Sequence, residues 1–257
     1  MLQDYSHLTE VTGSKVSREQ LERMYNRYAY AAELSEGKDA LEVGCGVGQG
    51  LGLIASKARR VVGGDYTQSL VDAAKAHYGD RIDIQQFDAQ KMPFEDNSFD
   101  VVFLYEAIYY VPKAEKFVDE CRRVLRPGGK VVICSANKSW SGFCASPHSY
   151  TYYSVPELTE LLEAKGFKVE CRADCPTSDS SLKSKVFGVI RKMFVKFDLM
   201  PKNMKAKEKF KRLVFGKLQD MPAELTADAA KYSPPVRIEK NRPTSDYKVI
   251  FAVGTIV

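Results

Sequence analysis

The feature of this sequence that most constrains its fold is a short apolar run that leads directly into a cluster of glycines. Residues 40–43 read Ala-Leu-Glu-Val, residues 44–50 read Gly-Cys-Gly-Val-Gly-Gln-Gly, and a helix-like segment follows from Leu51. Glycine lets a backbone turn sharply and approach a ligand closely, and a helix start presents free N–H groups. The pattern predicts a strand, a ligand-binding turn and a helix in succession.

Strand-like runs recur along the chain at the spacing of β-helix-β units. They lie at residues 40–43, 60–62, 82–86, 99–104 and 130–134, and helix-like segments at 51–58, 69–78 and 114–125 separate them. Two later runs, at 167–173 and 247–257, read as further strands. Such alternation is typical of a parallel sheet with helices on both faces. We therefore expect an α/β, doubly wound fold with a seven-stranded, mostly parallel sheet.

The last two predicted strands are separated by about 70 residues, which is too long for a bare loop. We expect residues 1–175 and 246–257 to form the core, and residues 176–245 to form an inserted helical cap or substrate subdomain before the last strand.

Charge is spread unevenly along the 257 residues. The chain carries +5 in total, but residues 183–217 hold 12 Lys and Arg against two acids, so this segment is +10 and the rest is −5. Three interpretations of the basic segment stay open: a cap helix with its lysines in water, contact with an anionic membrane or a lipid-linked acceptor, and nucleic acid. Nucleic acid is disfavoured because no aromatic stacking platform accompanies the charge.

The remaining composition indicates an intracellular globular protein. The six cysteines are scattered singly, without the C-x-x-C pairs of a zinc site, and we expect reduced thiols and no bound metal. No apolar run approaches the roughly 18–20 residues that span a bilayer, and the N-terminus shows no export signal. We expect a cytoplasmic location, with the basic segment as the candidate for peripheral membrane contact.

The glycine cluster alone fits more than one nucleotide-like cofactor. The dinucleotide fingerprint requires Gly or Ala at its sixth position, where this chain has Gln49. The spacing E-x-G-x-G-x-G, from Glu42 to Gly48, instead resembles the first motif of class I S-adenosylmethionine-dependent methyltransferases. Asp65, just after the second strand, can accept hydrogen bonds from two ribose hydroxyls and fits either cofactor. Asp88, after the third strand, favours the methyltransferase, in whose pattern it receives the adenine amino group.

The resemblance extends in consistent order over roughly residues 25–173, including 92–102 and 124–133. It implies a Rossmann-like methyltransferase fold, S-adenosyl-L-methionine as cofactor, and a small-molecule, sugar or lipid-linked methyl acceptor. Residues 24–32 look like a helix that closes over the cofactor in relatives acting on small molecules, although core packing of its tyrosines is the alternative. The cofactor-binding residues that follow are Arg27, Tyr28, Glu42, Gly44, Gly46, Gly48, Asp65, Tyr66, Asp88, Ala89 and Tyr105.

A sulfonium methyl is already activated, so a base is needed only when the acceptor loses a proton. We predict His148 as that base because it follows the fifth strand at the ligand-binding edge of the sheet. Its loop resembles a histidine-containing loop of sugar methyltransferases, but the acid expected nearby is absent. Tyr109 and Glu106 are the next candidates. Two other functions stay open: an NAD-dependent oxidoreductase on the same fold, and a non-catalytic S-adenosylmethionine-binding protein.

Overall fold

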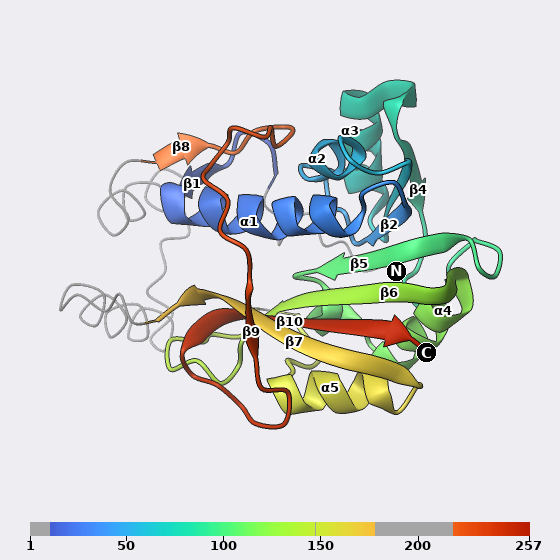
Figure 1. Ribbon diagram of the computed structural model, residues 1–257. Coiled ribbons are helices and arrows are strands. Elements are labelled where there is room, and N and C mark those ends of the chain that lie inside the picture. The colour runs from blue at the N-terminus through green and yellow to red at the C-terminus, as the bar shows by residue number, and fades with distance from the viewer. Residues whose placement is uncertain (1–10, 147, 178–217) are drawn as a thin grey trace.

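The central element of the structure is one large sheet. The computed structural model describes residues 11–146, 148–177 and 218–257, and its main sheet has eight strands in the order β4-β3-β2-β5-β6-β10-β7-β9 (Figure 1). The predicted strands are all present: β2 (Asp39–Val43), β3 (Arg60–Asp65), β4 (Asp83–Gln86), β5 (Phe99–Tyr105), β6 (Leu125–Ala136), β7 (Phe167–Pro176) and β10 (Tyr247–Ile256). All run parallel except β10, which is antiparallel to both of its neighbours.

Two short pairings were not predicted. The eighth strand, β9 (Val236–Ile238), pairs antiparallel with β7 at the sheet edge. A separate two-stranded sheet joins β1 (Lys15–Ser17) to β8 (Leu218–Asp220). Strands of three residues are too short for an alternating pattern to be visible in the sequence.

Helices cover both faces of the main sheet, which confirms the doubly wound architecture (Figure 1). One face carries α1 (Arg18–Leu34), α2 (Leu51–Ala55) and α3 (Gln68–Tyr78). The other face carries α4 (Ala114–Val124) and α5 (Val155–Glu163). Single 3-10 turns follow α3 and β5, at η1 (Gly79–Arg81) and η2 (Ile108–Tyr110).

The ends of α1 and α5 follow from their sequences. At α1 the Ser17 hydroxyl accepts a hydrogen bond from the Gln20 backbone at 3.2 Å, and the Gln20 side chain accepts one from the Ser17 backbone at 2.9 Å. Glu157 accepts in the same way from the Ser154 backbone at 2.6 Å, at the helix start that the sequence predicts. These reciprocal bonds satisfy N–H groups that have no partner within the helix.

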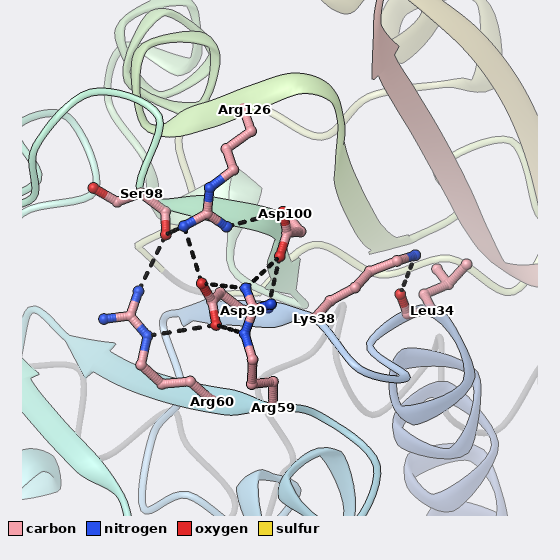
Figure 2. A network of polar contacts seen from close by, with 8 residues as sticks. All are labelled: Leu34, Lys38, Asp39, Arg59, Arg60, Ser98, Asp100 and Arg126. Atoms are coloured by element: carbon pink, nitrogen blue, oxygen red, sulfur yellow. Dashed lines mark hydrogen bonds and ion pairs between the residues drawn. The ribbon is translucent and has the colours of Figure 1, made fainter.

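An ion-pair network fixes the amino ends of the parallel strands (Figure 2). Asp39, the first residue of β2, accepts from Arg59 at 2.9 Å and from Arg126 at 3.0 Å, while its own backbone N–H donates to Asp100 at 2.8 Å. The hydrogen bonds from Arg59 hold the pKa of Asp39 below the ordinary aspartate value, although partial burial opposes them. This network lies at the edge of the sheet where the parallel strands begin. It takes no part in the opposite edge, where these strands end.

The predicted cap, residues 176–245, divides into two parts. Residues 178–217, which include the whole basic segment, lie outside the described residues. Residues 218–245 return to the core: Met221 and Leu225 are buried beside α1 and α2, and the Leu225 backbone donates to the Gln49 carbonyl at 2.7 Å. The two ends of the stretch are neighbours, because Pro176 is the register partner of Tyr247, and within it β9 adds the edge strand beside β7. No helix in the described ranges is long and apolar enough to cross a membrane.

Candidate functional site

A cavity of about 380 Å³ lies where the parallel strands end. Its walls come from α1 and from the loops that follow β2, β3, β4 and β5. Ligands collect at this edge in open α/β sheets. It is lined by nine of the predicted cofactor residues: Arg27, Tyr28, Gly44, Gly46, Asp65, Tyr66, Asp88, Ala89 and Tyr105.

The glycine turn adopts backbone angles that favour glycine. Gly44, Gly46 and Gly48 have φ of 71°, 59° and 82°. A Cβ on Gly44 would lie 3.1 Å from the Cβ of Ala107, so the two loops approach as closely as a residue without a side chain allows. Gly48 does not line the cavity; a Cβ there would lie 3.0 Å from the ring of Tyr78, so this glycine serves packing against α3.

Asp65 ends β3 and joins the glycine turn to the next loop. One carboxylate oxygen accepts from the Gly46 backbone and the other from the Thr67 backbone, both at 2.9 Å. Burial raises the pKa of Asp65 above the ordinary value, and these two hydrogen bonds act in the opposite direction. The Tyr66 backbone and the Thr67 side chain lower the pKa of Asp65 as further hydrogen-bond donors, so the carboxylate is held in one orientation in the cavity wall.

Asp88 lies in the loop after β4, next to the aromatic ring of Phe87 in the same wall. One Asp88 oxygen accepts from the Gln90 backbone at 2.8 Å, which holds the carboxylate in a tight turn. The ring supplies a flat apolar surface and the acid an acceptor beside it. This combination suits a purine base that carries an amino group.

Glu42 does not line the cavity but lies behind it. Tyr28 donates from its hydroxyl to one Glu42 oxygen at 2.6 Å, and the other oxygen is buried without a hydrogen-bond partner among the described residues. Burial raises the pKa of Glu42 to about 7, while the bond from Tyr28 and the charge of Arg27 act to lower it. The pair ties α1 to β2 across the core and sets the position of the Tyr28 ring in the wall.

Glu106, directly after β5, brings a carboxylate into the cavity. Its φ is 52°, a conformation that non-glycine residues rarely adopt outside constrained sites. One Glu106 oxygen lies 3.7 Å from Arg27 Nη1, and the other accepts from the Tyr109 hydroxyl at 3.1 Å. Burial raises the pKa of Tyr109 well above its ordinary value. Arg27, Glu106 and Tyr109 therefore form one polar group in the wall of the cavity that also holds Asp65 and Asp88.

His148, the first candidate base, is exposed and is not among the residues that line the cavity. The same loop reaches the cavity through Tyr150, which lines its mouth and is 53% exposed. Tyr152 stacks on Tyr109 with ring centres 4.3 Å apart, and its hydroxyl accepts from the Ser146 backbone at 3.0 Å. The loop after β6 therefore contributes tyrosines to the site, and its histidine lies away from it.

Several lining residues were not predicted, among them Arg23, Gln90, Tyr110 and Tyr150. Arg23 could have been predicted from the sequence, because it lies four residues before Arg27 and so shares its helix face. Gln90 and Tyr150 belong to loops whose path depends on tertiary packing. In the parts of the chain that the structure describes, no group of three or more His, Cys, Asp or Glu could hold a metal ion.

The site fits S-adenosyl-L-methionine on three observations. Gly44 and Gly46 present backbone without a side chain to the cavity, and the Asp65 and Asp88 carboxylates lie in the same wall. The Tyr105 hydroxyl, also in the wall, is buried without a hydrogen-bond partner among the described residues. A ligand with hydroxyl, amino and carboxylate groups would complete these partners.

Comparison with known proteins also indicates a methyltransferase. Residues 41–133 match the family model of the methyltransferase domain. A probable S-adenosylmethionine-dependent methyltransferase of Mycolicibacterium smegmatis is 39% identical over 153 residues, 58% of each chain. A probable phthiotriol/phenolphthiotriol dimycocerosates methyltransferase of Mycobacterium ulcerans is 42% identical over 113 residues, 41% of this chain and 42% of that one. The matched part thus spans little more than half of the first relative and less than half of the second.

Solved structures extend the likeness to nearly the whole chain. A SAM dependent methyltransferase from Archaeoglobus fulgidus has a TM-score of 0.57 to this chain at 16% identity, and the match covers 93% of this chain and 94% of that one. At this identity the likeness shows the fold. Residues 41–133 thus match the methyltransferase domain, and the chain as a whole has the fold of S-adenosylmethionine-dependent methyltransferases and is similar to them in sequence over about half its length.

Proposed function

We propose that this chain transfers a methyl group from S-adenosyl-L-methionine to a small-molecule or lipid-linked acceptor. The observation that carries the proposal is that one cavity joins the glycine turn, Asp65 and Asp88 to the polar group formed by Arg27, Glu106 and Tyr109. A cofactor held by the first set would have its reactive end directed at the second. A site that only stored a nucleotide would not need the second set.

The cofactor supplies a methyl group already activated by a positive sulfur, so the protein mainly has to place the reactants and exclude water. We assign the ribose to Asp65 and the adenine amino group to Asp88. Tyr28 and Tyr105, whose ring centres are 5.6 Å apart, pack edge to face beside the turn. Their rings keep water from that wall and present electron-rich faces that suit a cation.

We assign removal of the acceptor proton, where the acceptor is an alcohol or phenol, to Glu106. Its carboxylate lies in the cavity, whereas His148 is exposed and outside it. The bond from Tyr109 and the ion pair with Arg27 hold the carboxylate in one orientation. With the cofactor bound, an acceptor O–H would give its proton to Glu106 as the oxygen forms its bond to the methyl carbon and the methyl–sulfur bond breaks, so that S-adenosylhomocysteine is the leaving group.

We propose the class of acceptor from the residues that line the cavity and from the names of relatives. Tyr109, Tyr110 and Tyr150 give the open end of the cavity an aromatic character that suits an apolar or aromatic body. The Mycobacterium ulcerans relative is named for methylation of phthiotriol/phenolphthiotriol dimycocerosates, and a Caenorhabditis elegans relative for methylation of a sterol. The basic segment, residues 183–217, would suit a lipid surface on charge grounds, although it lies outside the described residues.

Calorimetric titration with S-adenosylhomocysteine and with NAD tests the cofactor. We expect binding of the first and not of the second, and we expect Asp65→Ala to weaken it by roughly 1.5–3 kcal/mol, the value of hydrogen bonds to a charged acceptor. Asp72→Ala, on the exposed face of α3, is the matched control. Binding of NAD instead would favour the oxidoreductase.

Turnover is tested separately with methyl-labelled cofactor and a panel of phenols, quinols, sterols and glycolipids. Label transferred to any of them establishes catalysis. Tight binding of S-adenosylhomocysteine with no label transferred across the panel would instead support a non-catalytic binding protein.

A further inference from the structure

Two arginines of α1 line the same cavity one helical turn apart, and they differ in their partners. Arg27 lies within ion-pair distance of Glu106, at 3.7 Å. Arg23 makes no hydrogen bond or ion pair through its side chain with any described residue, and its Nε atom is buried. A buried N–H of a charged group that lacks an acceptor costs free energy. Arg23 is therefore in a position to gain from an anionic ligand.

Arg23 lies over the half of the sheet away from the proposed adenosine end. Asp65 and Asp88 follow β3 and β4, on one side of β2 in the sheet. The charge of Arg23 instead acts on the thiols of Cys134 on β6 and Cys175 on β7, where it opposes the rise in thiol pKa that burial causes. Such an effect requires that the charges lie close together. Arg23 therefore lines the cavity on the side of β6 and β7, away from the strands that carry Asp65 and Asp88.

Asp174 on β7, whose charge also acts on the Cys134 thiol, makes its hydrogen bonds to other groups than Arg23. One oxygen of Asp174 accepts from the Cys175 backbone at 2.6 Å and the other from the Asn26 side chain at 3.5 Å. It forms no ion pair with Arg23. Of the charged residues that line the cavity, Asp65 and Asp88 are assigned to the cofactor and Arg27 faces Glu106. Among the described residues, Arg23 is thus the lining cation that forms no ion pair.

We propose that the guanidinium of Arg23 binds an anionic group, a carboxylate or a phosphate, carried by the methyl acceptor. Guanidinium presents a planar fork of donors that matches either oxyanion. The tyrosines at the open end would contact the apolar or aromatic body of the same molecule. This inference rests on the proposed function, because it takes the space beside Arg23 to be the acceptor's.

The test uses the full chain saturated with S-adenosylhomocysteine and three aromatic probes: benzoate, phenyl phosphate and the neutral benzamide. Calorimetry or ligand-detected NMR measures each affinity in wild type, Arg23→Met and Arg23→Lys. Arg18→Met is the matched control, since Arg18 lies on the same helix and pairs with Glu22 at the exposed surface. Comparison of benzoate with phenyl phosphate distinguishes the two anions.

We expect wild type and Arg18→Met to bind at least one anionic probe about tenfold or more tightly than benzamide, in line with a charged hydrogen bond. Arg23→Met should lose that preference, Arg23→Lys should keep part of it, and S-adenosylhomocysteine affinity should be the same in all four proteins. The inference is wrong if wild type shows no preference for the anions, or if Arg23→Met keeps it. A loss of S-adenosylhomocysteine affinity in Arg23→Met would assign Arg23 to the cofactor instead. Failure of wild type to bind S-adenosylhomocysteine would reject the proposed function itself.

Discussion

Glu42 is a carboxyl group in the interior whose ionisation is coupled to the fold. Burial raises its pKa from 4.5 to about 7, so the folded protein holds a proton that the unfolded chain has released between those pH values. A raised acid pKa contributes stability below the unfolded value, and that contribution is lost as the pH rises toward the folded value. The folded state therefore becomes less stable from about pH 4.5 to 7 on account of this residue.

Glu42→Gln should remove this dependence while retaining an acceptor for the Tyr28 hydroxyl. The rise in pKa corresponds to about 3 kcal/mol across the window, at about 1.4 kcal/mol per unit. Urea denaturation at several pH values between 5 and 8 measures it. The difference in the free energy of unfolding between variant and wild type should grow in favour of the variant as the pH rises. Parallel curves would show that Glu42 is ionised throughout.

The two candidate bases, Glu106 and His148, are distinguished by the effect of their substitution on catalysis. If Glu106 takes the acceptor proton, Glu106→Gln should lower kcat by about a hundredfold or more and leave S-adenosylhomocysteine affinity little changed. His148→Ala should then remain near wild type, because its side chain is exposed and outside the cavity. Steady-state kinetics on one hydroxyl acceptor decides between them. A large loss in His148→Ala with an active Glu106→Gln would restore the histidine as base.

At the scale of elements, the segment that returns over α1 and α2 is held by both apolar and ionic contacts. Met221 and Leu225 are buried, and between them Glu224 pairs with His77 of α3 at 2.8 Å and with Arg81 of η1 at 2.9 Å. Hydrogen bonds from Arg81 are the largest cause that lowers the pKa of Glu224. The segment thus closes one side of the turn that carries Gln49.

Glu224→Gln should destabilise the protein by roughly 0.5–1 kcal/mol at neutral pH, the range for a partly exposed ion pair. Because the pKa of Glu224 is lowered in the folded state, wild type should keep this advantage above about pH 4.5 and lose it as the pH falls further. Thermal denaturation at pH 7 and pH 4 measures both the loss of stability in the variant and its dependence on pH. Glu239→Gln, which removes an exposed pair with Arg242, is the control and should have little effect. Equal behaviour of the two variants would show that the apolar contacts alone hold the segment.

The sequence alone predicted the helices and strands that are long or have a strong apolar pattern. It also predicted the site residues that lie at the ends of those strands. The apolar run of β2 is buried along its whole length, and Gly44, Asp65 and Asp88 follow the ends of strands, so their meeting at one edge follows from parallel topology. Arg23 and Tyr150 were missed because their role depends on the angle of α1 and on the path of a loop. Strand β9 was missed because three residues show no period.

At the scale of the whole molecule, charge is separated along the chain. The basic segment carries +10 and the remainder −5, and transfer of a methyl group from a sulfonium requires no such excess. We propose that the segment meets an anionic surface or a lipid-linked acceptor. Exposed charges act over about 8–10 Å at physiological ionic strength, so such an interaction should weaken with added salt.

Reversal of Lys192, Lys196, Lys209 and Lys211 to Glu should therefore reduce binding to vesicles of anionic phospholipid, and salt should have the same effect on wild type. Affinity for S-adenosylhomocysteine should barely change. The control makes the same charge change at four exposed lysines elsewhere: Lys57, Lys75, Lys116 and Lys168. Vesicle sedimentation measures binding. If wild type does not bind the vesicles, or if both sets of reversals act alike, the basic segment has no specific surface role.

The long stretch between β7 and β10 begins and ends at neighbouring points of the sheet. Pro176 lies opposite Tyr247, and the Thr177 backbone donates to the Asp246 carbonyl at 2.7 Å. The entropy of closing a loop grows only slowly with its length, so insertions or deletions in this stretch that spare β9 and the buried Met221 and Leu225 place little demand on the sheet. Relatives could therefore exchange this stretch during evolution and acquire new acceptors while the cofactor half stays the same. Chimaeras joined at Pro176 and Tyr247 are the natural route to engineer acceptor choice in this chain.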